Sequence, residues 1–396
     1  MIYLDNAATT RLSDAALQAM LPYFQEQYGN PSSLYAFGQQ AQEALTAART
    51  TVARLLNAAD PREITFTSGG SESDNQALRS AAYLGARKGK KHLVSTTIEH
   101  HAVLHTLAAL EKEGFAVTLV PVPENGIVRP ADIAAALRPD TCLVSVMFAN
   151  NEIGTIQPVG EIGALCREKG ILFHTDAVQA AGHLDIDVQA LHSDLLSLSA
   201  HKFHGPKGAG VLYARKGVAL TPLIEGGAQE RGRRAGTENL PAIMGMAAAL
   251  EQACAHRAEN AARMAALRDR LIQGLSAIPH SVLNGDREHH LPGNVHFCFE
   301  GIEGESLLLL LDDAGICASS GSACTSGSLD PSHVLLAIGR PHEIAHGSLR
   351  LTLSPDTTQA EIDRTVEEVT RVVTYLRGMS PVWRDLEAGK TPFVIQ

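Results

Sequence analysis

Apolar, strand-like runs alternate with helical stretches over residues 63–214, and this alternation constrains the fold more than any other feature of the chain. Strands and helices that alternate in this way build a mostly parallel sheet covered by helices on both faces. Ligands of such sheets bind at the carboxyl ends of the strands. We therefore expect an α/β protein with a seven-stranded sheet, its strands at about 63–67, 92–96, 116–120, 143–148, 171–173, 195–198 and 210–214.

A lysine follows the sixth of these strands. Residues 195–210 read LLSLSAHKFHGPKGAG, so the apolar run ends in small polar residues, Lys202 and a Gly-Pro-Lys-Gly turn. Burial at a strand end lowers the pKa of a lysine amine. A neutral amine is the form that makes a Schiff base with an aldehyde cofactor. A surface lysine in a glycine- and proline-rich turn is the alternative, and it is favoured for an isolated Ser-x-His-Lys pattern.

An aspartate follows the preceding strand in the same way, because Asp176 comes just after the apolar run 171–173. Pyridoxal phosphate (PLP) needs a lysine for its aldehyde and a carboxylate beside its pyridinium nitrogen. The carboxylate keeps that nitrogen protonated, so that the ring can accept electrons. Asp176 and Lys202 at neighbouring strand ends predict a PLP site.

A glycine turn between a strand and a helix provides a candidate phosphate site. Residues 68–75, SGGSESDN, follow the strand at 63–67 and lead into a helix that ends at about residue 88. Free backbone N–H groups and the positive end of the helix dipole favour phosphate there, and Ser71 adds a hydroxyl donor. An ordinary capped helix after a tight turn explains this stretch equally well. The turn matches neither the P-loop nor the Rossmann pattern.

Composition narrows the class of protein. The chain has 396 residues and a net charge of −10, which argues against a general binder of nucleic acid or of anionic membranes. The longest aliphatic run, 307–311, is far too short to span a bilayer, and the first residues lack the features of a signal peptide.

We expect a cytoplasmic enzyme with a large cofactor-binding domain at 15–258. A smaller α+β domain would comprise 1–14 and 259–396.

A second unusual stretch, ASSGSACTSGS at 318–328, contains Cys324. It is too polar for a core strand and too rich in glycine and serine for a stable helix, so it predicts a flexible loop. A thiol on such a loop is suited to nucleophilic chemistry. Cys142, Cys166 and Cys298 lie in apolar or helical patterns, and we interpret them as packing residues.

These motifs together resemble the cysteine desulfurases of the class-V aminotransferase family, which are PLP-dependent enzymes of fold type I. The resemblance covers essentially the whole chain, and the long cysteine loop is similar to that of the NifS/IscS group rather than to the shorter loop of the group with selenocysteine lyases. The matching segments are 3–10 (YLDNAATT), 67–75 (TSGGSESDN), 99–104 (EHHAVL), 149–154 (ANNEIG), 174–179 (HTDAVQ), 199–208 (SAHKFHGPKG), 234–239 (RAGTEN), 319–328 (SSGSACTSGS) and the segment around Arg350.

The resemblance implies a role for each matching residue. Lys202 would form the Schiff base, Asp176 would face the pyridine nitrogen, and His100 would stack on the ring. Gln179 would bond the phenolate oxygen of the cofactor, and Asn151 would lie between cofactor and substrate. Arg350 would hold the substrate carboxylate, as its planar fork suits. The phosphate would be held by Gly70, Ser71, Ser199, His201 and, from a second subunit, Thr237. Relatives often have Ala-Thr in place of Gly70-Ser71, which keeps the hydroxyl.

The same resemblance implies conversion of L-cysteine to L-alanine by a homodimer, with Lys202, His100 and Cys324 as the catalytic residues. Cys324 would take the sulfur as a persulfide and deliver it to an iron–sulfur scaffold or another acceptor protein, and a transient cluster at Cys324 is compatible with this. Supply to nitrogenase clusters, to general clusters or to thiolation stays open. No metal, nucleic acid or membrane partner is implied.

Three other readings compete with this one. An aminotransferase of the same fold would share Lys202, Asp176 and Arg350 but would have no use for a cysteine on a flexible loop. A non-catalytic scaffold on this fold would be expected to have lost cofactor residues, which are all present here. A metal-binding protein would need a ligand spacing that the histidines and Cys324 lack.

Overall fold

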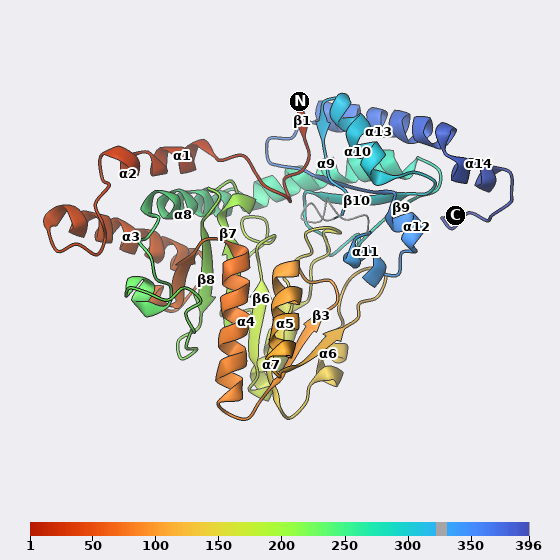
Figure 1. Cartoon of the computed structure of the whole chain (residues 1–396). Helices are drawn as coiled ribbons and strands as arrows, with labels where there is room; N and C mark the ends of the chain where they lie inside the picture. The colour runs from red at the N-terminus through yellow and green to blue at the C-terminus, as the bar shows by residue number, and fades with distance from the viewer. Residues whose placement is uncertain (322–330, 396) are drawn as a thin grey trace.

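The computed structural model describes residues 1–321 and 331–395, and its centre is a seven-stranded sheet (Figure 1). β8 is antiparallel to both of its neighbours, and the other strands pair in parallel. The predicted mostly parallel α/β sheet is therefore confirmed. In spatial order the strands are β2 (Ile64–Thr67), β8 (Gly210–Ala214), β7 (Leu195–Ser199), β6 (Leu172–Asp176), β5 (Thr141–Ser145), β3 (His92–Thr96) and β4 (Ala116–Val120).

Helices cover both faces of this sheet because successive residues of each strand point to opposite sides. Leu93, Leu143 and Leu195 pack with α4 (Gly70–Ala86) and α5 (His101–Lys112). The residues that follow them, Val94, Val144 and Leu196, belong to the core on the other face. That second core is covered by α3 (Ala36–Leu55), α6 (Pro130–Ala136), α7 (Val159–Lys169) and α8 (Leu240–Ala255).

A second, smaller core is built on an antiparallel sheet with the order β12 (Ser348–Thr352), β10 (Asn294–Phe299) and β9 (Ser281–Leu283). Alternate residues of β10 enter this core, which is closed by α9 (Arg257–Ser276), α10 (Gly304–Asp313) and α13 (Gln359–Met379). The α+β character expected of this part is confirmed. The domain boundaries at 14/15 and 258/259 stay a prediction.

The N-terminal residues lie with this second core. β1 (Ile2–Tyr3) pairs in parallel with β11 (Ile316–Cys317), and Leu4 packs in the same core as β10. From there the chain runs through Asp5 and Ala8 to the carboxyl ends of the large sheet, where Thr10 bonds the carbonyl of His201. The first ten residues therefore connect the two cores.

Two helix boundaries differ from the sequence-based expectation. The sequence predicts one helix that is capped by Ser13 and runs to about Phe24. In the structure it divides into α1 (Asp14–Met20), which Ser13 caps, and α2 (Pro22–Gln25). The sequence also predicts one long helical region at 239–278, and in the structure it divides at His256 into α8 and α9. The remaining short helices are α11 (His333–Ala337), α12 (His342–Ala345) and α14 (Pro381–Glu387). Within the described part of the chain, no helix combines the length and the apolarity needed to cross a bilayer.

Candidate active site

A cavity of about 260 Å³ opens at the carboxyl ends of the central strands. It gathers side chains from β6, from the turns after β2 and β7, from the start of α5 and from β12. A larger cavity of about 540 Å³ elsewhere contains none of the predicted site residues. The predicted residues that line the smaller cavity are Gly70, Ser71, His100, Asn151, Asp176, Gln179, Ser199, His201, Lys202 and Arg350.

Lys202 ends the short 3₁₀ helix Ala200–Lys202 that follows β7. Its ammonium group donates hydrogen bonds to the carbonyl oxygens of Ala7, at 2.5 Å, and Ala8, at 2.8 Å. The amide of Gln179 donates to the same Ala7 carbonyl over 3.0 Å. The N-terminal segment therefore holds the lysine amine at the wall of the cavity.

Asp176 ends β6 and is buried, with its Oδ1 accepting a hydrogen bond from the backbone N–H of Val178 over 2.9 Å. Burial raises the pKa of Asp176 to about 6, against the opposing effect of the charge on Lys202. Two further buried carboxyls lie nearby. Burial and the charge of Asp176 raise the pKa of Asp74, and burial raises that of Glu99 to about 8. A cavity wall with this excess of acidic groups favours a cationic group beside Asp176.

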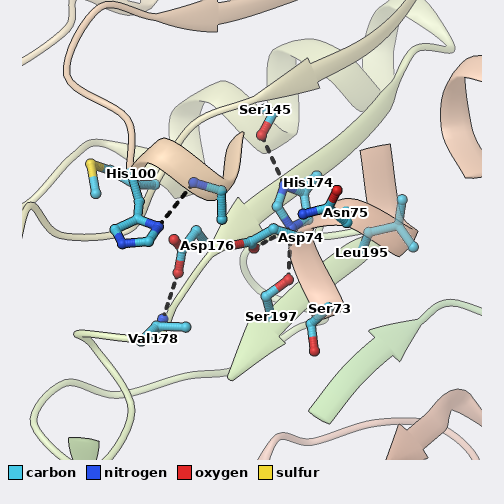
Figure 2. A network of polar contacts seen from close by, with 12 residues as sticks. Ser73, Asp74, Asn75, His100, Ser145, His174, Asp176, Val178, Leu195 and Ser197 are labelled. Atoms are coloured by element: carbon cyan, nitrogen blue, oxygen red, sulfur yellow. Dashed lines mark hydrogen bonds and ion pairs between the residues drawn. The ribbon is translucent and has the colours of Figure 1, made fainter. Parts of the chain in front are cut away.

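A buried network behind Asp176 fixes the position of its strand, and Figure 2 shows it from close by. His174 lies two residues before Asp176, and its Nδ1 and Nε2 lie 2.8 Å from Ser145 Oγ and 3.0 Å from Ser197 Oγ. Burial lowers the pKa of His174 to about 3, so the ring is neutral. Oδ1 of Asp74 lies 3.6 Å from His174 Nε2 and has no hydrogen-bond partner among the described residues.

His100 caps the N-terminus of α5, where its Nδ1 accepts a hydrogen bond from the N–H of Ala102 over 3.1 Å. Burial, followed by the charge of Lys202, lowers the pKa of His100 to about 4. The ring is therefore neutral with its proton on Nε2. A neutral, flat ring at this place can stack on an aromatic ligand.

The predicted phosphate site is the N-terminus of α4, where glycines allow the backbone to come close to its neighbours. A Cβ on Gly70 would lie 2.6 Å from Val178 Cγ2, and a Cβ on Gly210 would lie 2.6 Å from the Cα of Gly69. Ser71 and His201 line the same end of the cavity. Thr237 is exposed in this chain and does not line it.

Arg350, in β12, is buried and also lines the cavity. Nη1 donates to the carbonyls of Asn151, at 3.1 Å, and Gly321, at 3.0 Å, and Nη2 donates to Oδ1 of Asp5 at 2.9 Å. Nε is buried without a hydrogen-bond partner among the described residues. The unused Nε donor suits a carboxylate ligand.

Cys324 lies outside the described residues. Among the other cysteines, burial raises the pKa values of Cys142 and Cys298 to about 11 and that of Cys166 to about 12. These thiols stay protonated at neutral pH, which agrees with their interpretation as packing residues. Sequence reasoning assigned no role to several lining residues, namely Ala7, Ala8, Asp74, His101, Met147, Glu152, Val178 and His333.

Lys202, Asp176 and the helix N-terminus at Gly70 line one cavity at the strand ends of this sheet. These features define a PLP-dependent enzyme of fold type I, and the solved relatives share this fold. The cysteine desulfurase IscS of Clostridium botulinum is 54% identical over 98% of this chain and 98% of its own length. The cysteine desulfurase NifS of Azotobacter vinelandii is 49% identical over 96% of this chain and 95% of its own length. A solved NifS-like protein, 40% identical, superposes with a TM-score of 0.89 over 95% of this chain and 100% of its own.

Residues 2–365 match the family described as aminotransferase class-V. The chain belongs to this family and, within it, to the cysteine desulfurases of the NifS/IscS group.

The family is PLP-dependent, and the residues of the cavity fit this cofactor. Gly70 and Ser71 at the start of α4 line the cavity, so the free N–H groups of this helix N-terminus are available to the phosphate. The buried carboxyl groups of Asp176 and Asp74 also fit the cofactor. Burial raises the pKa of Asp176, and Oδ1 of Asp74 has no hydrogen-bond partner among the described residues. A cationic ring nitrogen beside them would therefore stabilise their negative charge.

Proposed function

We propose that this protein is a cysteine desulfurase that converts L-cysteine to L-alanine and passes the sulfur through Cys324 to an acceptor protein. The observation that carries the proposal is the single cavity that brings together Lys202, Asp176 and Arg350. These residues meet the needs of an amino-acid substrate: an amine for the cofactor aldehyde, a carboxylate for the ring nitrogen and a guanidinium for the substrate carboxylate.

The cofactor would be held along the length of the cavity. Asp176 would face its ring nitrogen, His100 would stack on the ring, and Gln179 would bond its phenolate oxygen. Its phosphate would lie at the start of α4 with Gly70, Ser71, Ser199 and His201, and Thr237 of a second subunit would complete that site. When bound, PLP supplies an electron sink that weakens the Cβ–S bond of the substrate.

The side chains of this chain then perform the remaining steps. Arg350 orients the substrate carboxylate, Asn151 lies between substrate and cofactor, and the amine of Lys202 moves the α-proton. The thiolate of Cys324 attacks the substrate sulfur, and a new S–S bond forms as the Cβ–S bond breaks. The electron pair of the broken bond stays with the substrate carbon, which takes up a proton to become the methyl group of alanine.

The sulfur on Cys324 is then available to a second protein. The acceptor we propose is an iron–sulfur cluster scaffold, with supply to nitrogenase clusters as one use, and the working unit is a homodimer. The NifS and IscS relatives are named cysteine desulfurases, which supports the sulfur-transfer step of this proposal.

Incubation of the purified, PLP-loaded protein with L-cysteine and a reductant, followed by assay of alanine and sulfide, tests the proposal. We expect the two products in a one-to-one ratio. An aminotransferase would instead need a keto-acid acceptor and would release a keto acid from cysteine without sulfide. That result would replace the proposed function.

A further inference from the structure

Glu152 is a buried carboxyl group that none of the steps above uses. It belongs to the ANNEIG segment, directly after Asn151, and its residue is only 1% exposed although it lines the cavity. Its backbone N–H donates to Oδ1 of Asn150 over 2.8 Å, so the main chain around it is fixed. A carboxyl group that is buried in this way needs partners, and its partners indicate what it does.

Oε2 of Glu152 lies beside two residues that flank the segment 322–330. It accepts a hydrogen bond from the hydroxyl of Ser332. A Cβ on Gly321 would lie 2.7 Å from the same Oε2 and 2.8 Å from Cβ of Ser332, so a larger residue at position 321 would displace these side chains. Gly321 and Ser332 therefore meet at one oxygen atom of Glu152.

The same residues are tied to the arginine that is proposed to hold the substrate carboxylate. Nη1 of Arg350 donates to the carbonyls of both Asn151 and Gly321. The backbone N–H of Arg350 also donates to the carbonyl of Ser319 over 2.6 Å. Arg350 thus fixes the chain that leads into 322–330, and Glu152 joins the chain that leaves it.

Ser332 adds a link to the helix that follows. Its Oγ accepts from the N–H of Val334 over 3.1 Å, which caps α11. The next residue, His333, has its Nε2 3.0 Å from the carbonyl of Glu99 and its ring 4.7 Å from that of His101. A shift of Ser332 would therefore also move α11 and the histidine at the cavity wall.

We propose that Glu152 is a positioning residue that holds Gly321 and Ser332 together beside Arg350, so that the residues on either side of 322–330 are fixed for sulfur transfer by Cys324. This inference rests on the proposed function. Burial raises the pKa of Glu152, and the hydrogen bond from Ser332 and the charge of Arg350 oppose that shift. The role needs no particular protonation state, because an oxygen of a carboxylate, of a carboxylic acid or of an amide can each accept the Ser332 hydrogen bond.

The test separates substrate binding from sulfur transfer. In a Cys324→Ala background without turnover, Glu152→Ala should bind L-cysteine within threefold of the unsubstituted protein, measured from the change in cofactor absorbance. With Cys324 present, Glu152→Ala should form alanine and sulfide at least tenfold more slowly than wild type. Glu152→Gln keeps the acceptor oxygen and the volume, and it should recover the rate to within threefold.

Glu300→Ala is the matched control. Glu300 is also a buried glutamate that joins distant segments, since it accepts from the N–H groups of Val394, at 2.8 Å, and Ile395, at 2.9 Å. It does not line the cavity. Its loss should destabilise the fold but leave cysteine binding and sulfur transfer to a small-molecule reductant within twofold of wild type.

If Glu152→Ala does not fold, Ser332→Ala removes the same hydrogen bond from the other side and should slow the reaction by a similar factor, whereas Ser332→Thr should not. The inference is overturned if Glu152→Ala or Ser332→Ala transfers sulfur at the wild-type rate, or if Glu152→Gln is as slow as Glu152→Ala. Failure of the proposed function looks different, because wild type itself would then release neither alanine nor sulfide.

Discussion

The carboxylate of Asp5 accepts a hydrogen bond from Nη2 of Arg350 over 2.9 Å, although 345 residues separate the two along the chain. The Arg350 side chain is only 2% exposed and that of Asp5 is 20% exposed. A charge as deeply buried as that of Arg350 is costly unless a counter-ion lies beside it. Asp5 therefore stabilises the guanidinium before any substrate carboxylate arrives.

Asp5→Asn should destabilise the apo-protein by about 2 kcal/mol, less than the loss of a fully buried partner because Asp5 is partly exposed. The amide keeps a hydrogen-bond acceptor, so the change removes the charge alone. Urea unfolding of both proteins measures the difference. L-Alanine, which brings its own carboxylate, should stabilise the variant more than wild type. Equal stabilities would show that Arg350 does not depend on this charge.

The pKa of Asp176 predicts a pH effect on the apo-protein. Burial raises this pKa from 3.8 to about 6, so between these values the folded protein binds more protons than the unfolded chain. Stability should therefore fall as pH rises through this window, by about 3 kcal/mol in total for two pKa units. Asp176→Asn does not titrate there and should lack this contribution. Urea unfolding of both apo-proteins at pH 4 and pH 7 tests this prediction. If the free energies of unfolding of wild type and variant change equally between the two pH values, the prediction is wrong.

Lys202 should be the attachment site of the cofactor. Borohydride reduction of the PLP-loaded protein should fix the cofactor to the peptide that contains Lys202, and Lys202→Ala should lose the visible absorbance of the Schiff base. Lys207, five residues later in the Gly-Pro-Lys-Gly turn, is the control, and Lys207→Ala should stay yellow. Peptide mapping by mass spectrometry decides between them, and a label on Lys207 would refute the assignment.

Cys324→Ala should separate cofactor chemistry from sulfur transfer. The variant should stay folded and yellow and should still change its spectrum with cysteine, because Lys202, Asp176 and Arg350 are intact. It should release alanine and sulfide at least a hundredfold more slowly than wild type, since no thiolate attacks the substrate sulfur. In wild type quenched before reductant is added, mass spectrometry should find one extra sulfur on the Cys324 peptide. Extra sulfur on Cys317 instead would show that Cys324 is not the nucleophile.

A shared active site predicts complementation between two inactive or weakened chains. Thr237 is exposed and outside the cavity of its own chain, as expected for a residue that acts on a partner. When Lys202→Ala and Thr237→Ala chains exchange subunits, each mixed dimer has one site with both defects and one site with neither. Activity should then recover to roughly a quarter of wild type for random mixing. If activity does not increase although subunit exchange has been verified, the active site is not shared between two subunits.

Sequence reasoning succeeded where a residue follows a strand directly. Asp176 ends β6, and Lys202 lies in the short helix that directly follows its parallel neighbour β7, so the topology brings both residues to one edge of the sheet. The sequence also contained one signal that was missed, because Pro22 at the first position of α2 marks the break after α1. The division at His256 has no proline or glycine beside it, and tertiary packing decides it.

Contacts between distant segments could not be predicted. Asp74 is on the inner side of α4, and only the packing of that helix on β6 and β7 places it beside His174. Glu152 meets Ser332 across 180 residues, and no spacing in the sequence indicates that pair. The acceptors of the Lys202 ammonium are backbone carbonyls of Ala7 and Ala8, which carry no sequence signature.

The pairing of β1 with β11 has a consequence for synthesis of the protein on the ribosome. Ile2 and Tyr3 pair with Ile316 and Cys317, so the strand made first waits for a partner made near the end. At about 5–20 residues per second, roughly 20–70 s pass between translation of Asp5 and of Arg350. Until then β1 has no partner strand and Arg350 is missing from the cavity, so the nascent chain cannot complete the cavity described above.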